Sequence, residues 1–202
     1  MPDDPPGSPP QAPGARLWPL YAGGFLGPFA GAMTGVMLPE LAAGLDTTIG
    51  GASLAGSWFM LPFAAALLVS GTLAARWGEA RVVRTAFLTY AAASLVGVFA
   101  TTLGPFLVGR ALQGMSNAFT TPLLIAMLAA LSPPHRRGRA MGIFASMQAS
   151  GIAFAPVIGG AAAAVDYRIA FGAAAAVAVA LAMLMPTAHV LPSGGAVTAR
   201  EK

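Results

Sequence analysis

The sequence predicts an all-α membrane protein with six transmembrane helices and both termini in the cytoplasm. Only 9% of its 202 residues are charged, whereas soluble domains carry about 25%. The charged residues separate six uncharged runs, and each run exceeds the roughly 20 helical residues that cross a bilayer. Basic residues alternate between successive connecting segments. This composition argues against a cytosolic enzyme, a nucleic-acid-binding domain and a disordered chain.

The uncharged runs define the helices in chain order. Residues 85–134 are interrupted by a single charge, Arg110, and one helix of that length would measure about 75 Å. Gly104-Pro105 is therefore expected to separate two helices. Residues 17–186 form the predicted bundle, between a disordered, Pro-rich cytoplasmic tail at 1–16 and a flexible cytoplasmic tail at 187–202. The helices are predicted near 17–38, 50–74, 83–102, 105–131, 140–164 and 168–186.

The positions of the basic residues predict the orientation of the bundle. The connections after the second and fourth helices hold three Arg each, and alternate segments sum to nine basic residues against one, Arg168. The positive-inside rule then places both termini in the cytoplasm of a cell-membrane protein with several spans. The six loop arginines are Arg76, Arg81, Arg84, Arg136, Arg137 and Arg139.

Small residues in the first and fifth predicted helices favour close helix packing. Glycines recur every fourth residue from Gly23 to Gly35, which is the small-xxx-small pattern. The fifth helix carries Gly151, Ala155 and Gly159 on one face. We expect this second face to meet another bundle, with ordinary packing inside the chain as the alternative.

A polar stripe marks the fourth predicted helix. Arg110, Gln113, Gly114, Asn117 and Thr121 fall within about 100° of one another on a helical wheel. Polar groups are costly in hydrocarbon, so the stripe must face a cavity or a neighbouring helix. Arg110 could instead extend to the outer interface. The candidates for a substrate or proton route are Arg110 and Gln113, with Asn117 and Gln148 as weaker ones.

Residue types that perform catalysis are absent from the predicted spans. No Asp, Glu, Lys or His lies inside them, and the chain has no cysteine and two histidines. We therefore expect no enzyme activity, no cofactor and no metal site. A carboxylate that couples transport to protons would have to lie outside these helices.

Four short motifs carry a family resemblance. GTLAARWGEAR at 71–81 resembles the signature of the major facilitator superfamily between its second and third helices. Gly71, Arg76, Gly78 and Arg81 match it, whereas Ala75 replaces an Asp. The resemblance implies that this segment is a gating loop on the cytoplasmic side, and the missing Asp weakens the implied clamp.

The other motifs follow in family order. RALQG at 110–114 resembles the second family motif, and PPHRRGRAMG at 133–142 resembles the basic loop between helices four and five. GIAFAPVIGG at 151–160 resembles the antiporter motif, with Ala155 in place of a glycine. In the family that motif is characteristic of exporters. Its matching positions are Gly151, Pro156, Gly159 and Gly160.

The resemblance covers residues 17 to about 190 and implies one six-helix bundle with a 3+3 repeat, of the drug-efflux antiporter type. Family members usually have twelve or fourteen helices, so we expect a half-size protein. It would export a small amphipathic compound by alternating access, as a homodimer or with a second six-helix half. The expected partners are the lipid bilayer and a small-molecule substrate, not nucleic acid. The alternative is a truncated, non-transporting membrane protein that only packs with other helices.

Overall fold

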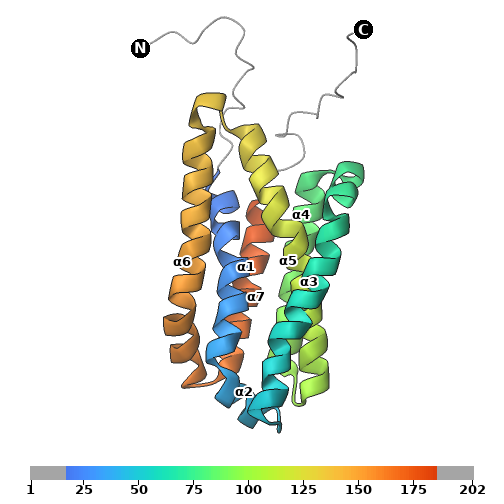
Figure 1. Cartoon of the computed structure of the whole chain (residues 1–202), viewed down its shortest axis with the longest axis vertical. Helices are drawn as coiled ribbons and strands as arrows, with labels where there is room; N and C mark the ends of the chain where they lie inside the picture. The colour runs from blue at the N-terminus through green and yellow to red at the C-terminus, as the bar shows by residue number, and fades with distance from the viewer. Residues whose placement is uncertain (1–16, 186–202) are drawn as a thin grey trace, which may run out of the picture.

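A computed structural model describes residues 17–185, and this part of the chain consists of helices and short connections. The long helices run alongside one another in a single elongated bundle (Figure 1). Both predicted tails lie outside the described residues. The elements are α1 (Trp18–Val36), α2 (Leu38–Gly44), α3 (Ile49–Trp77), α4 (Glu79–Phe99), α5 (Leu103–Leu131), the 3₁₀ turn η1 (Pro134–Arg136), α6 (Arg137–Ala163) and α7 (Tyr167–Leu184).

Five helices, α3 to α7, are long and apolar enough to cross a membrane, with η1 counted into α6. A sixth span results if α1 and α2, which meet at an angle of 72°, are taken together. The sequence did not predict α2. Its Pro39 lies in the first turn, where the missing N–H has no helical partner to lose, so the chain resumes a helix after the bend.

Two predicted helix boundaries shift for local reasons. The break expected at Gly104-Pro105 lies earlier, at Ala100–Thr102, and Pro105 falls in the first turn of α5, where proline is tolerated. The connection between the second and third predicted helices, which are α3 and α4, consists of one residue, Gly78, with φ 87° and ψ 130°. Because glycine adopts positive φ readily, α4 begins at Glu79 instead of near residue 83.

Apart from Arg110, the described charges gather at the two ends of the bundle. The α3–α4 and α5–α6 connections, with their six arginines, lie at the end where α1 begins and α7 finishes (Figure 1). The opposite end holds Glu40, Asp46, Asp166 and Arg168. Arg16, His189, Arg200 and Lys202 lie outside the described residues. The separation agrees with the alternation seen in the sequence, and the side that faces the cytoplasm stays a prediction.

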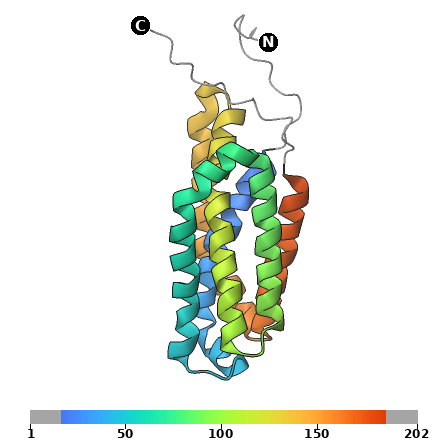
Figure 2. The ribbon, with the colours of Figure 1, turned by 90° about the vertical axis from the view of Figure 1, so that its right-hand side faces the viewer.

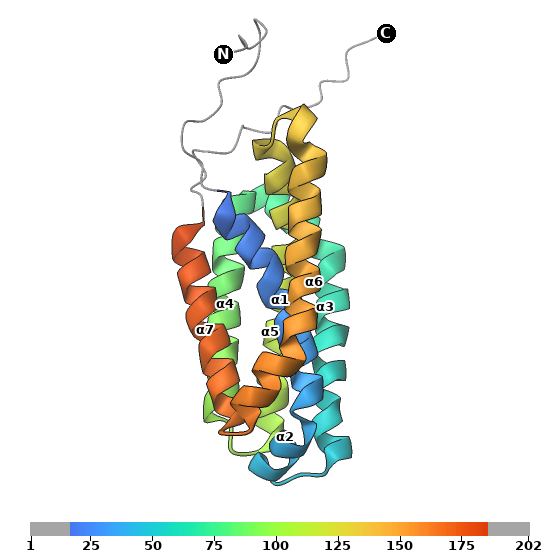
Figure 3. The ribbon, with the colours of Figure 1, turned by 90° about the vertical axis from the view of Figure 1, so that its left-hand side faces the viewer.

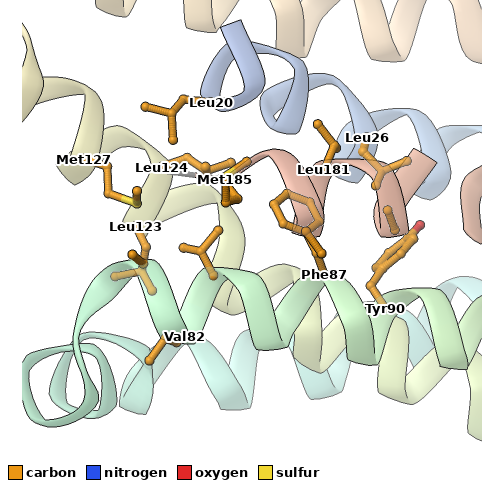
Figure 4. Packing of buried hydrophobic residues seen from close by; sticks show 14 of the residues in the cluster. Leu20, Leu26, Val82, Phe87, Tyr90, Leu123, Leu124, Met127, Leu181 and Met185 are labelled. Carbon is orange, nitrogen blue, oxygen red and sulfur yellow. The ribbon is translucent and has the colours of Figure 1, made fainter. Parts of the chain in front are cut away.

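Side chains from six helices, α1 and α3 to α7, form the larger apolar cluster of the bundle. Figure 4 shows Phe87 of α4 near Leu181 of α7, with Leu20 of α1 and Leu124 of α5 in the same cluster. Lipid is as apolar as these side chains, so close fit rather than water exclusion favours their association. Gly23 contributes to the fit, because a Cβ there would lie 2.8 Å from Leu124 Cδ1.

The small-residue face of α6 packs inside the chain, which makes the expectation of a second bundle on this face wrong. α6 runs along α1 (Figure 3), and Gly151, Ala155 and Gly159 are buried. A Cβ on Gly151 would lie 3.1 Å from the Phe29 backbone N, and one on Gly159 would lie 3.0 Å from Met33 Cβ. Because Gly151 and Gly159 have no side chains, the α1 backbone can approach α6 closely. This face of α6 is therefore occupied by α1.

Candidate functional site

The candidate site centres on Arg110 of α5, whose side chain is 1% exposed. Its Nη1 donates a hydrogen bond to Gln113 Oε1 at 2.7 Å. Its Nε donates to the carbonyl oxygen of Ala55 on α3 at 3.4 Å, and its Cζ lies 4.6 Å from the centre of the Phe59 ring. Arg110 is thus enclosed between helices and does not extend to the interface.

The network continues from α5 into α4. Gln113 Nε2 donates to Ser94 Oγ at 2.8 Å, and that hydroxyl donates to the Tyr90 carbonyl oxygen at 2.9 Å. Sequence analysis missed Ser94 and Tyr90. Ser94 and Tyr90 are four residues apart and therefore lie on one face of α4, and that spacing could have revealed them.

Glycines on α5 bring the three backbones together around this network. A Cβ on Gly114 would overlap the carbonyl oxygen of Phe59 in α3. A Cβ on Gly109 would lie 3.0 Å from the carbonyl oxygen of Ala93 in α4. Figure 2 shows α5 between α3 and α4. Because α5 has glycine where it touches α3 and α4, the helices lie close together. The Arg110 side chain can therefore reach the carbonyl oxygen of Ala55 on α3.

The guanidinium group has no acidic partner within residues 17–185. The described ion pair joins Arg168 and Asp166, 3.8 Å apart, at the far end of the bundle. Arg110 Nη2 and the Tyr90 hydroxyl have no hydrogen-bond partner among the described residues. An unpaired buried polar group costs about 1–3 kcal/mol. Arg110 Nη2 is therefore the donor of this network that lacks an acceptor.

The weaker candidates lie apart from this network. Asn117 is 9% exposed, and its Oδ1 accepts a hydrogen bond from Thr120 at 3.1 Å. It faces α1, because a Cβ on Gly27 would overlap it. Gln148 on α6 is half-buried and makes none of the described hydrogen bonds. The structure thus joins Arg110 and Gln113, and leaves Asn117 and Gln148 outside the hydrogen-bonded set.

The residues of the predicted gating loop lie on the surface at the basic end. Gly71, Arg76, Gly78 and Arg81 are exposed. Among residues 17–185 neither arginine has an acidic partner within ion-pair distance. In the antiporter motif, Gly151 and Gly159 are buried, Pro156 is exposed and Gly160 is half-buried.

Comparisons with a family model and with known proteins point to one family of transporters. Residues 20–201 match the family model described as Major Facilitator Superfamily. The chain is 28% identical over 155 residues to the puromycin resistance protein pur8 of Streptomyces alboniger, covering 74% of this chain and 31% of that protein. It is 30% identical over 126 residues to the drug efflux pump JefA of Mycobacterium tuberculosis, covering 62% of this chain and 25% of that protein.

Solved structures share the fold. A peptide transporter POT in complex with sulfate aligns with a TM-score of 0.73 at 20% identity, over 83% of this chain and 36% of that one. A D-xylose-proton symporter aligns with a TM-score of 0.71 at 13% identity, over 85% of this chain and 48% of that one. The chain therefore spans about a quarter to a third of the length of these curated relatives, and less than half of either solved transporter.

Proposed function

The chain belongs to the major facilitator superfamily, and we propose that it takes part in exporting a small amphipathic compound across the cell membrane by alternating access. The observation that carries this proposal is the family match over residues 20–201. Relatives named as a drug efflux pump and a puromycin resistance protein support export as the direction. The family suggests a transporter rather than an enzyme.

Within this proposal, Arg110 and Gln113 form the polar part of the compound's route. Arg110 holds a positive charge among apolar helices, and its Nη2 is free of protein partners in the described part of the chain. A carbonyl, phosphate or carboxylate oxygen of the cargo would satisfy that group. No acid contacts it there, so a proton-carrying carboxylate would lie elsewhere than beside Arg110.

Alternating access needs a second bundle, since the cargo binds between two bundles that rock against each other. We propose that a second copy supplies it. We do not propose the Gly151 face of α6 as the contact, because within this chain it packs on α1. Other faces remain open, since α3 exposes Leu61 and Leu68, and α6 exposes Val157.

Reconstitution tests this function directly. The chain is placed in liposomes at densities from below one copy to several copies per vesicle, and uptake of radiolabelled puromycin is measured. We expect uptake to rise with the square of the density, because two copies must meet. A linear rise would contradict the two-bundle proposal. No uptake at any density would contradict puromycin export by this chain and favour the non-transporting alternative.

The orientation is tested with single cysteines, which the native sequence lacks. We expect His135→Cys to react with a membrane-impermeant maleimide only after lysis, and Val165→Cys to react in intact cells. Both positions are exposed and lie at opposite ends of the bundle. The reason is the concentration of arginines at the His135 end. Labelling of position 135 in intact cells would reverse the proposed orientation.

A further inference from the structure

A groove of about 310 Å³ opens on the outer side of the bundle, where α3, α4 and α5 meet. These three helices lie side by side on the face shown in Figure 2. The groove is separate from the candidate site, because neither Arg110 nor Gln113 lines it. Its walls include Trp77, Arg81, Ala86, Leu112, Met115 and Phe119.

The floor of the groove is suited to a hydrocarbon chain. Two hydroxyl groups in its lining are engaged within their own helices. Thr85 donates to the Arg81 carbonyl oxygen at 2.9 Å, and Ser116 donates to the Leu112 carbonyl oxygen at 2.8 Å. These two hydroxyls therefore make no polar demand on an occupant, and Thr89 is the one other hydroxyl residue in the lining.

The mouth of the groove is positively charged. Arg81 is the charged residue of the lining, and it is exposed at the basic end of the bundle. The same hairpin carries Arg76 and Arg84 against one acid, Glu79. Trp77, 62% exposed, lies beside Arg81, as tryptophans do at membrane–water interfaces.

We propose that the groove binds one anionic phospholipid, with an acyl chain along α4 and α5 and the phosphate at Arg81. Basic pockets between membrane helices bind anionic headgroups in this way. A transmembrane helix of a partner is about 10 Å or more across and is too wide to enter such a space. The proposal requires insertion in a membrane and does not depend on transport.

The fluorescence of Trp77 reports occupancy. The chain has three tryptophans, so Trp18→Phe with Trp58→Phe leaves Trp77 alone. This protein is reconstituted in phosphatidylcholine vesicles that contain rising fractions of phosphatidylglycerol with brominated acyl chains, which quench nearby tryptophan. The control is the same titration with brominated phosphatidylcholine in place of brominated phosphatidylglycerol. We expect half-maximal quenching at a roughly fivefold lower fraction of phosphatidylglycerol, the effect of one arginine near an anionic surface.

Two variants separate the headgroup contact from the acyl-chain contact. Arg81→Gln should abolish the preference, whereas Arg139→Gln, an exposed arginine at the same end but on α6, should retain it. Thr85→Phe, at an exposed position in the lining, should fill the groove and reduce quenching by phosphatidylglycerol to the level of phosphatidylcholine. Each variant must keep the parent's helical circular dichroism.

Three results would overturn the proposal. Equal quenching of the parent by the two lipids would show that the groove has no anionic selectivity. A preference that survives Arg81→Gln or Thr85→Phe would place the lipid elsewhere. A preference lost equally in Arg139→Gln would show a general attraction of the basic end and not a site.

Discussion

Gly114→Leu is expected to abolish the folded bundle. Gly114 lies where α5 crosses α3, and even a Cβ there would overlap the carbonyl oxygen of Phe59, which is backbone and cannot rotate away. The two helices would have to separate, and Arg110 would lose its bond to Ala55. Overpacking costs about 1–3 kcal/mol and sometimes more, and here the loss of the buried network is added.

The measurement is size-exclusion chromatography of the detergent-purified chain, followed by thermal unfolding. Gly114→Ala should already lower the melting temperature, because its Cβ is the clashing atom. Gly56→Leu is the matched control, on α3 and near Phe59 in sequence, since a Cβ there meets nothing within 4 Å. A monodisperse Gly114→Leu protein with the parent's melting temperature would contradict the close contact of α3 and α5.

Arg110→Lys is expected to lower puromycin transport at least tenfold in any preparation of this chain that transports. Lysine keeps the charge but lacks the planar guanidinium, so one ammonium cannot bond Gln113 and Ala55 and also lie over Phe59. Loss of one hydrogen bond to a charged group costs roughly 1.5–3 kcal/mol, which corresponds to a tenfold change or more.

Ser94→Ala separates a transport role of Arg110 from a purely structural one. It removes the acceptor of Gln113 Nε2 but leaves the Arg110–Gln113 bond intact. We expect Ser94→Ala to lower the melting temperature and keep transport, whereas Arg110→Lys loses transport beyond its change in stability. Full transport by Arg110→Lys, or equal losses in both variants, would refute the assignment of Arg110 to the route.

Much of the site could be predicted from the sequence, and the reason is membrane chemistry. An arginine and an amide one turn apart inside an apolar span must meet protein or water. The sequence therefore predicts Arg110 and Gln113 as candidates, and the structure joins the two side chains by a hydrogen bond. Ser94 and Tyr90 were missed because hydroxyl groups are common in such spans and can bond to their own helix. Whether the Ser94 hydroxyl accepts a bond from Gln113 depends on which face of α4 meets α5.

The glycines of α6 show where sequence reasoning reaches its limit. The spacing of Gly151, Ala155 and Gly159 indicates a face for close packing, and the structure has that face buried. The identity of its neighbour was predicted wrongly, because small residues permit close approach by any helix and specify no partner. Only the three-dimensional arrangement shows that α1 is that neighbour.

The helical class, the membrane spans apart from the bend between α1 and α2, and the separation of charges between the two ends could be predicted from the sequence, and short motifs indicated the family. The spans and the charge separation follow from the length and composition of each segment. Only the packing of the helices shows which of them touch, that Arg110 is enclosed against Ala55 and Phe59, and that a groove opens beside Arg81. Such features arise where helices distant in the sequence meet, and in lipid that meeting depends on the fit between surfaces rather than on hydrophobicity.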